Sequence, residues 1–207
     1  MRILPAKAQI VQDYLHASPD GLKWVGLGVS IRTIASVAYD CRPGRVVFDT
    51  PAPGGRYDFI TSLPQGSLEA LQQELKNGLG FVGRRESRET DVLVLKVRDE
   101  NASGLRPATL GGTQNWSQPG RYYCDDVPLS STNRALQGLA QFLERAFRKP
   151  VIDQTGLTQH FNIDLRWDAR HPRQREAIQE AMLKRLGLEL VPGRETVELL
   201  VVEKARQ

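Results

Sequence analysis

The sequence predicts an α+β protein of two homologous β-α-β-β-α-β units, each a small sheet with helices packed on one face. The first observation is a repeat: a strand, a helical segment, a Leu-Gly step and a closing strand recur roughly a hundred residues further on, a period typical of domain duplication. The Leu79-Gly80 and Leu186-Gly187 steps align the copies. The second observation is that no helix separates the β-prone runs 45–49 and 56–63. Neighbouring parallel strands would need a crossover helix between them, so a purely parallel sheet is disfavoured. Two-layer packing is therefore favoured.

The first unit is expected over residues 1–100. Segment 29–39 carries apolar residues at the spacing of an amphipathic helix, namely Ile31, Ile34, Ala35 and Ala38. Ser30 is a suitable N-cap for this helix. The remaining predicted elements are strands over 45–49 and 56–63, a helix over 67–76 that ends at Gly78 and Gly80, and a strand over 90–97.

A linker or long surface loop is expected over 101–121, because Asn, Ser, Gly, Thr and Pro dominate there without an apolar period. The second unit, 122–207, is expected to contain a helix from Ser130 or Ser131 to about Phe147. Its other predicted elements are strands over 151–153, 161–167 and 196–203, a helix over 173–186 and a possible hairpin arm over 188–191 that turns through Pro192-Gly193.

Composition excludes few function classes. The net charge of +4 comes from cations scattered among acidic residues, so a nucleic-acid partner is not expected. No apolar run approaches the roughly 20 residues of a membrane helix, so direct membrane insertion is not expected either. The first residues lack the apolar core of a signal peptide, so either the protein is cytosolic or an export signal or further domain precedes Met1.

The cysteines and histidines show no metal-ligand spacing, so neither a metal nor another cofactor is expected. His16, His160 and His171 are interpreted as ordinary surface residues. The sequence leaves open whether Cys41 and Cys124 form one disulfide or remain two separate thiols.

Asp153-Gln154-Thr155-Gly156 superficially resembles the Asp-Thr-Gly of aspartic proteases, a chemistry that needs two such carboxylates. The corresponding place in the first unit reads Asp49-Thr50-Pro51 and lacks the glycine. We therefore interpret Asp153 as bonded to its own backbone in a turn, with Gly156 at positive φ and Leu157 packed inward. The sequence contains no Walker A loop, nucleophile elbow or dinucleotide-binding glycine pattern.

Two groups of arginines stand out, Arg84, Arg85 and Arg88 in the first unit and Arg166, Arg170, Arg173 and Arg175 in the second. A solvated face is the first interpretation of both groups, and a site for an acidic partner or a phosphate-bearing ligand is the alternative. Trp116, Tyr122 and Tyr123 form either an aromatic contact surface or a cover over the junction of the units.

The segments 150–157, 161–167, 186–190 and 197–203 resemble the bacterial "soil-associated protein" family, and 28–39 fits the first helix of that family. The resemblance implies an uncharacterised, exported domain, periplasmic or secreted, that is sometimes fused to thioredoxin-like oxidoreductases or to membrane-bound sensor peptidases. The family has no established catalytic residues. Each unit is also similar to the short N-terminal domain of secretins and TonB-dependent receptors, which binds partner proteins.

The sequence favours a non-enzymatic, extracytoplasmic interaction module with a protein partner in the bacterial envelope. An exposed strand edge could accept a partner strand. The alternative is a hydrolytic or thiol-dependent enzyme with its site in a groove between the units. Its candidate residues are Asp153, Asp164, Asp168 and His171, with Cys41 and Cys124 for the thiol version. The oligomeric state and the ligand are left open.

Overall fold

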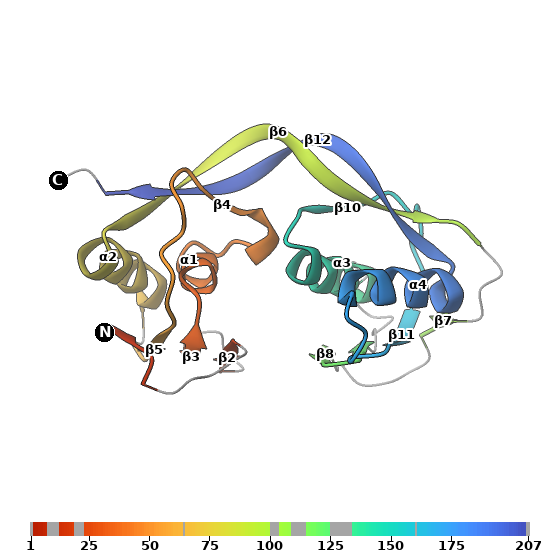
Figure 1. Ribbon diagram of the computed structural model, residues 1–207, viewed down its shortest axis with the longest axis horizontal. Helices are drawn as coiled ribbons and strands as arrows, with labels where there is room; N and C mark the ends of the chain where they lie inside the picture. Colours follow the sequence, from red (N-terminus) through yellow and green to blue (C-terminus); the bar gives the residue numbers. More distant parts are fainter. Residues whose placement is uncertain are drawn as a thin grey trace. The chain divides into compact units, whose positions relative to one another are not determined.

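The computed structural model describes residues 2–7, 13–18, 23–63, 65–99, 104–108, 115–124, 134–159 and 161–205. Helices and strands are mixed, as the predicted α+β class requires (Figure 1). The chain forms two compact units: Met1–Arg88 with Thr196–Gln207, here unit 1, and Glu89–Glu195, here unit 2. These units differ from the expected ranges 1–100 and 122–207. Unit 1 includes the C-terminal residues 196–207, and unit 2 includes residues 89–100, so each unit contains the end of the strand that closes the other half of the sequence.

Unit 1 contains an antiparallel sheet in the order β1-β5-β3-β2. Its strands are β1 (Ile3–Pro5), β2 (Tyr14–Ala17), β3 (Trp24–Val29) and β5 (Tyr57–Thr61). The helices α1 (Ile31–Ala38) and α2 (Ser67–Leu79) lie on one side of it. The strand β4 (Val46–Phe48) and the adjoining parts of β6 (Phe81–Val97) and β12 (Leu188–Lys204) lie beyond the helices.

The helices of unit 1 are therefore covered on two sides, whereas the sequence analysis expects cover on one face. The reason is visible in α1, where six of the eight residues are buried, more than a single apolar stripe. Phe59 contributes to this core from the β1-β5-β3-β2 sheet, and Val46 and Leu200 contribute from the opposite layer. A second layer of strands is needed because the helix has buried residues on opposite sides.

Unit 2 contains a sheet in the order β7-β11-β9-β8, again with antiparallel neighbours. Its strands are β7 (Arg106–Pro107), β8 (Asn115–Gln118), β9 (Arg121–Cys124) and β11 (Phe161–Arg166). The helices α3 (Arg134–Phe147) and α4 (Gln174–Leu186) lie between this sheet and a layer containing β10 (Val151–Asp153) (Figure 1). The described parts of 101–121, expected as a linker or loop, thus include two strands.

The two units share one arrangement of elements. The strand orders β1-β5-β3-β2 and β7-β11-β9-β8 are equivalent, with β5 and β11 each lying between an edge strand and the strand that precedes the first helix. After that strand, the chain of both units continues with a helix, two strands, a second helix and a long strand. The short strands β4 and β10 each pair in parallel with a long strand, through Leu200↔Val46 and Val151↔Leu93. A common ancestry of the units remains a prediction that this correspondence supports.

The long strands β6 and β12 span 17 residues each, and the division between the units falls within both. The sequence analysis places the first strand only over 90–97 and expects a hairpin at Pro192-Gly193. The strand over 90–97 is confirmed but begins earlier, at Phe81, whereas the hairpin is wrong, because each long strand begins directly after the Gly that ends the preceding helix and then runs on without a turn. A Cβ on Gly193 would lie 2.9 Å from Val94 Cγ2, so the glycine permits a close approach of β12 to β6 and not a turn.

The strand predicted over 196–203 is likewise the later part of β12, and the other predicted helices and strands are confirmed to within three residues at their ends. Ser30 caps α1 by accepting a hydrogen bond from Thr33 N, and Gly80 ends α2 in the left-handed conformation with φ +70°. The predicted caps Ser130 and Ser131 lie outside the described residues.

Candidate functional site

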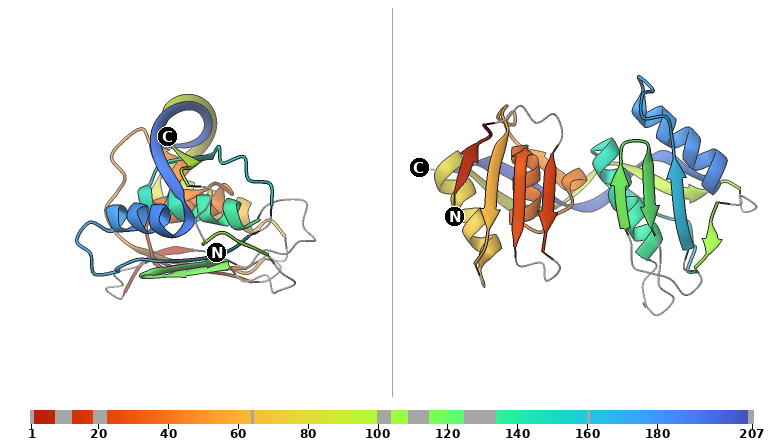
Figure 2. Two further views of the ribbon diagram at one scale, coloured as in Figure 1. Left: turned by 90° about the vertical axis from the view of Figure 1, so that its right-hand side faces the viewer. Right: turned by 90° about the horizontal axis from the view of Figure 1, so that it is seen from below.

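The outer face of the β1-β5-β3-β2 sheet is the surface that faces away from α1 and α2. Strand alternation directs one set of side chains to it, while the alternate residues, such as Phe59, face the helices. The outward set is read from the register Leu4↔Asp58, Ile60↔Val25, Val25↔His16 and Leu27↔Tyr14. The right-hand view of Figure 2 shows this sheet in front of its helices, with no described element over it. We call this surface the apolar face.

Large apolar side chains are exposed on the apolar face. Leu4 is 52% exposed, Tyr14 54%, Leu27 41% and Ile60 59%, and Val25 is half-buried between them. The described residues contain only three further exposed large apolar side chains, Leu15 in the same sheet, Leu63 just after β5 and Leu183 in α4. Contiguous exposed apolar surface on a folded domain commonly marks a site of interaction.

Gly26 and Phe59 set the shape of the sheet beneath the apolar face. The two residues are cross-strand partners, and a Cβ on Gly26 would lie 2.3 Å from Phe59 Cε1. The aromatic ring therefore lies across the glycine backbone on the helix side. Between Gly26 and Val29 the register with β5 shifts, a bulge that turns the chain toward the start of α1.

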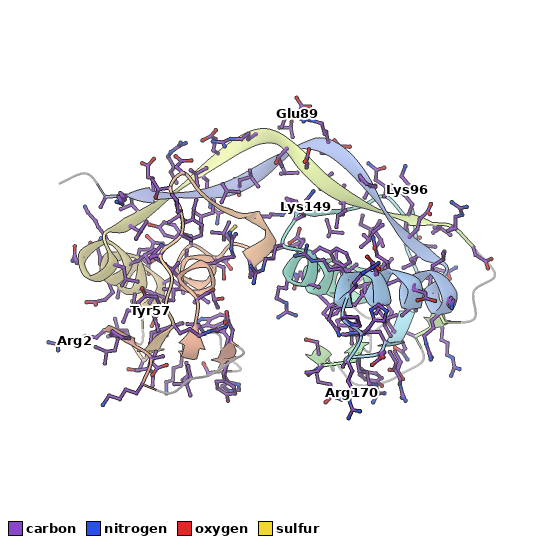
Figure 3. The ribbon with its side chains drawn as sticks, viewed as in Figure 1. Arg2, Tyr57, Glu89, Lys96, Lys149 and Arg170 are labelled. Carbon is purple, nitrogen blue, oxygen red and sulfur yellow. The ribbon has the colours of Figure 1, made fainter. Side chains whose placement is uncertain are left out.

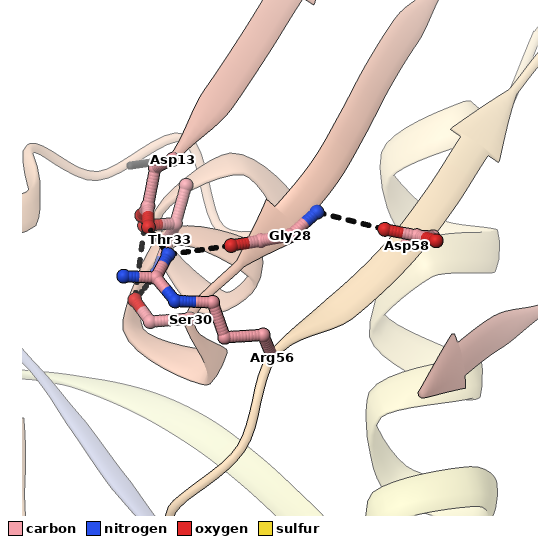
Figure 4. Close-up of polar contacts among 6 residues, drawn as sticks. All are labelled: Asp13, Gly28, Ser30, Thr33, Arg56 and Asp58. Atoms are coloured by element: carbon pink, nitrogen blue, oxygen red, sulfur yellow. Dashed lines mark hydrogen bonds and ion pairs between the residues drawn. The ribbon is translucent and has the colours of Figure 1, made fainter. Parts of the chain in front are cut away.

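A polar network holds the end of the sheet where this bulge lies (Figure 4). Gly28 N donates to Asp58 Oδ1 at 2.7 Å, and Arg56 Nη1 donates to Gly28 O at 2.5 Å. Arg56 also forms an ion pair with Asp13, whose other carboxylate oxygen accepts a hydrogen bond from Thr33 in the first turn of α1. The two carboxylates of this region are thus bound by donors of the same unit.

The corresponding face of the β7-β11-β9-β8 sheet is polar. The register Asp164↔Tyr123 and Arg166↔Arg121 places charged side chains and a tyrosine on its outer surface. Arg121 Nε donates to Asp164 Oδ1 at 2.6 Å and Arg166 Nη2 donates to Asp164 Oδ2 at 2.8 Å. The Arg121 guanidinium also lies over the Tyr123 ring, 5.4 Å from its centroid.

Asp164 has a lowered pKa in this environment. Partial burial acts to raise the pKa, but the hydrogen bonds from Arg121 and Arg166, together with their positive charges, outweigh it. The carboxylate is thereby held in its charged form as the acceptor between two guanidinium groups. Both carboxylate oxygens of Asp164 accept hydrogen bonds from arginines, so this arrangement is a structural ion-pair network.

The other acidic candidates of the enzymatic alternative do not join Asp164. Asp153 Oδ1 accepts hydrogen bonds from Thr155 N at 2.9 Å and Thr155 Oγ1 at 2.7 Å, Gly156 has φ +68° and Leu157 packs against the core. The predicted turn is confirmed. It follows β10, so the helices of unit 2 separate it from the sheet that carries Asp164.

Asp168 and His171 lie in the turn after β11. Asp168 Oδ1 accepts a hydrogen bond from Arg170 N at 2.8 Å, and His171 Nδ1 accepts one from Arg173 N at 3.1 Å. Both side chains therefore bond to the local backbone. Figure 3 shows Arg170 extending outward from this turn.

The cysteines are separate free thiols in the structure. Cys41 follows α1 in unit 1 and is half-buried, and Cys124 is part of the core of unit 2. His16 is an exposed residue of β2, and His160 lies outside the described residues. Among the residues described, no cluster of three or more His, Cys, Asp or Glu side chains is arranged to hold a metal ion.

The arginines of β6 are compensated by carboxylates of their own unit. Arg84 pairs with Glu86 and, at 3.6 Å, with Glu203, while Arg85 pairs with Glu198. Arg88 Nη2 lies 3.0 Å from Glu86. Hydrogen bonds from Arg84 and then Arg88 lower the pKa of Glu86. This pattern favours the first interpretation, a solvated face, over an anion site.

The second arginine group is dispersed. Arg166 binds Asp164, Arg173 Nη1 lies 3.1 Å from Glu176, and Arg175 Nε donates to Ala146 O at 3.3 Å beside the Phe147 ring. Their partners belong to a strand, the helix α4 and the end of α3. The described side chains therefore do not converge on one ligand position.

The three aromatic candidates have different roles. Tyr122 is buried in the core of unit 2, stacked on Phe142 at a centroid distance of 5.0 Å. Tyr123 is on the outer face beneath Arg121, and the side chain of Trp116 lies outside the described residues. Tyr122 is thus a core residue, not part of a contact surface.

The residues of the apolar face were missed by the sequence analysis. The run Tyr57-Asp58-Phe59-Ile60-Thr61 shows strand alternation only weakly, because apolar Phe59 and Ile60 are adjacent and point to opposite faces. The signal that was available is Gly26, whose place within a β-prone run suggests a close backbone approach.

The fold and this surface define an α+β protein in which one of two similar sheets exposes apolar side chains. A family model described as "Protein of unknown function (DUF3738)" matches residues 32–205, and the chain belongs to this family. No curated protein and no solved structure matches the chain. No helix within the described residues is long and apolar enough to cross a membrane.

Proposed function

We propose that the protein is a non-enzymatic binding module of the bacterial cell envelope, and that a partner protein docks on the apolar face of unit 1. The observation that carries this proposal is the concentration of exposed large apolar side chains on the outer face of one sheet: Leu4, Tyr14, Leu27 and Ile60. Interfaces of this kind gain free energy mainly by removing such side chains from water.

Two further observations support a docking role. The face belongs to a sheet that is tied to α1 by the Asp13, Arg56 and Thr33 network, so the surface is organised before a partner arrives. The edge strands β1 and β2 border the face, and either could extend the sheet with a partner strand, as the sequence analysis suggests. The envelope location and a secreted or periplasmic role rest on the resemblance to the soil-associated protein family.

Site-specific photo-crosslinking tests this proposal. A photoreactive benzoyl-phenylalanine is placed at Ile60 of the full chain, and the same group is placed at Asn162 on the outer face of unit 2 as the matched control. Exposure to an envelope extract of the source bacterium is expected to give a discrete adduct from position 60 that the Leu27→Ser variant loses. Equal adducts from positions 60 and 162, or none from position 60, would refute a docking role for the apolar face.

A further inference from the structure

We infer that the segment docking on the apolar face belongs to another protein and carries acidic side chains beside its apolar ones. This inference rests on the proposed function and adds the chemistry of the partner. It comes from the charges that border the face and from the partners those charges have.

Two cations border the apolar face without an ion-pair partner among the described residues. Extending the register Ile3↔Phe59 by one residue places Arg2 opposite Ile60, and Lys23 precedes β3 on the same side of the sheet as Val25. Both residues are exposed, and in the part of the chain described neither side chain forms an ion pair. Figure 3 shows the Arg2 side chain pointing away from the body of unit 1.

The described carboxylates of the same region form no ion pair with these cations. Of the described carboxylates, Asp13 is paired with Arg56, whereas Asp58 keeps its charge, accepts the Gly28 N hydrogen bond and forms no ion pair with Arg2 or Lys23. The positive charges of Arg2 and Lys23 are therefore available to a partner. Charge complementarity with a docking segment requires Asp or Glu at the positions that meet them.

A second copy of this chain does not satisfy that requirement. Two apolar faces in contact would bring four cations, Arg2 and Lys23 of each copy, to one interface against only the two Asp58 carboxylates. The outer face of unit 2 is no better, because Arg106, Arg121 and Arg166 lie there with Asp164 already bound by two of them. Like charges at an interface disfavour association.

A lipid surface fits less well than a polypeptide. Asp58 is the cross-strand partner of Leu4 and lies beside Leu27 at the bulge, so insertion of these leucines into a bilayer would carry a carboxylate with them. A peptide can avoid this cost because its own backbone N–H groups can meet the carboxylate.

A peptide-display selection tests the inference. A random library is selected on the full-length protein and depleted against the Ile60→Ser/Leu27→Ser variant, so that only peptides bound at the apolar face are retained. We expect retained peptides to be enriched in Asp and Glu next to Leu, Ile, Phe or Tyr. One retained peptide is then synthesised, and its Kd is measured by fluorescence anisotropy.

The variant Arg2→Glu/Lys23→Glu is expected to raise that Kd by roughly tenfold, and high salt should reduce this effect. Arg106→Glu/Arg170→Glu makes the same change of net charge in unit 2 and is expected to leave the Kd within about twofold. Circular dichroism and thermal unfolding identify any variant that fails to fold, and for such a variant the reversed peptide, with Lys in place of Glu, is tested on the natural protein instead.

Retained peptides without acidic enrichment, or a Kd that does not respond to charge reversal, would overturn this inference and leave the proposed function intact. Binding to phosphatidylglycerol vesicles that depends on Ile60 would overturn it in favour of a lipid surface. If no peptide depends on the apolar face, the inference is also overturned, and the photo-crosslinking result decides separately whether the proposed function stands.

Discussion

The two antiparallel sheets have equivalent strand orders, but the outer face of one is apolar and that of the other is charged. On β1-β5-β3-β2 the outward positions hold Leu4, Tyr14, Leu27 and Ile60, whereas β7-β11-β9-β8 shows the ion-paired Arg121, Asp164 and Arg166. The inward positions of both sheets are apolar and packed against helices. Because the fold constrains only the inward residues, the outward ones are free to differ, and this difference locates the candidate site on unit 1.

The units also differ in how their first helix is joined to the short parallel strand. In unit 1 the Arg32 guanidinium donates to Val46 O, and in unit 2 the fully buried Glu144 accepts a hydrogen bond from Val151 N at 3.1 Å. The first residue of each parallel strand is thus held by a side chain of the preceding helix, an arginine in unit 1 and a glutamate in unit 2. The junction in unit 2 is the more deeply buried of the two.

The largest effect is expected at this buried junction. Glu144→Ala leaves Val151 N without its side-chain acceptor in the core, and we expect a loss of about 2–3 kcal/mol in the free energy of unfolding. Glu144→Gln retains an oxygen acceptor and should lose less. Urea unfolding measures both, and an equal loss in the two variants would show that the hydrogen bond to Val151 is not the cause.

The next largest effect is expected at Gly26, where the packing in the middle of the two sheets differs. In unit 1 the absence of a side chain at Gly26 leaves room for the Phe59 ring. In unit 2 the inward residue Tyr122 has a large side chain that is itself buried in the core. Gly26→Ala is therefore expected to cost about 1–3 kcal/mol through displacement of the ring. Gly54→Ala is the control, because nothing lies within 4 Å of its added Cβ, and a similar cost there would contradict this account.

The smallest effect is expected on the charged face of unit 2. Since the pKa of Asp164 is lower in the folded protein than in the unfolded chain, its contribution to stability is present above the unfolded pKa of about 4 and is lost as the pH falls through the folded value. At neutral pH, Asp164→Asn should cost about 0.2–1 kcal/mol, because the ion pairs are partly exposed to solvent. The difference between variant and natural protein should vanish in strong acid, as followed by thermal unfolding against pH. A difference that persists there would assign the loss to packing.

Most helices are predictable from the sequence because their signals are local. The spacing of Ile31, Ile34 and Ala38 and the cap at Ser30 predicted α1, and the Asp153 turn was predicted from hydrogen-bonding residues two positions apart. The long strands were predicted only in part, because Pro192 and Gly193 indicate a turn unless the neighbouring strand is known. The β7 and β8 strands were missed because their segments are short and rich in polar residues.

The candidate site depended on tertiary structure more than the fold did. Whether Ile60 or Phe59 faces the core is decided by the helices that cover one side of β5, and no local pattern distinguishes them. The sequence by itself determined the α+β class, the order of the main elements and the resemblance to an uncharacterised family. Tertiary structure alone decided the second layer of strands over the helices, the separation of Asp153 from Asp164 and the exposure of the apolar face. Burial and pairing depend on residues distant in sequence, and the chain brings those residues together only by folding.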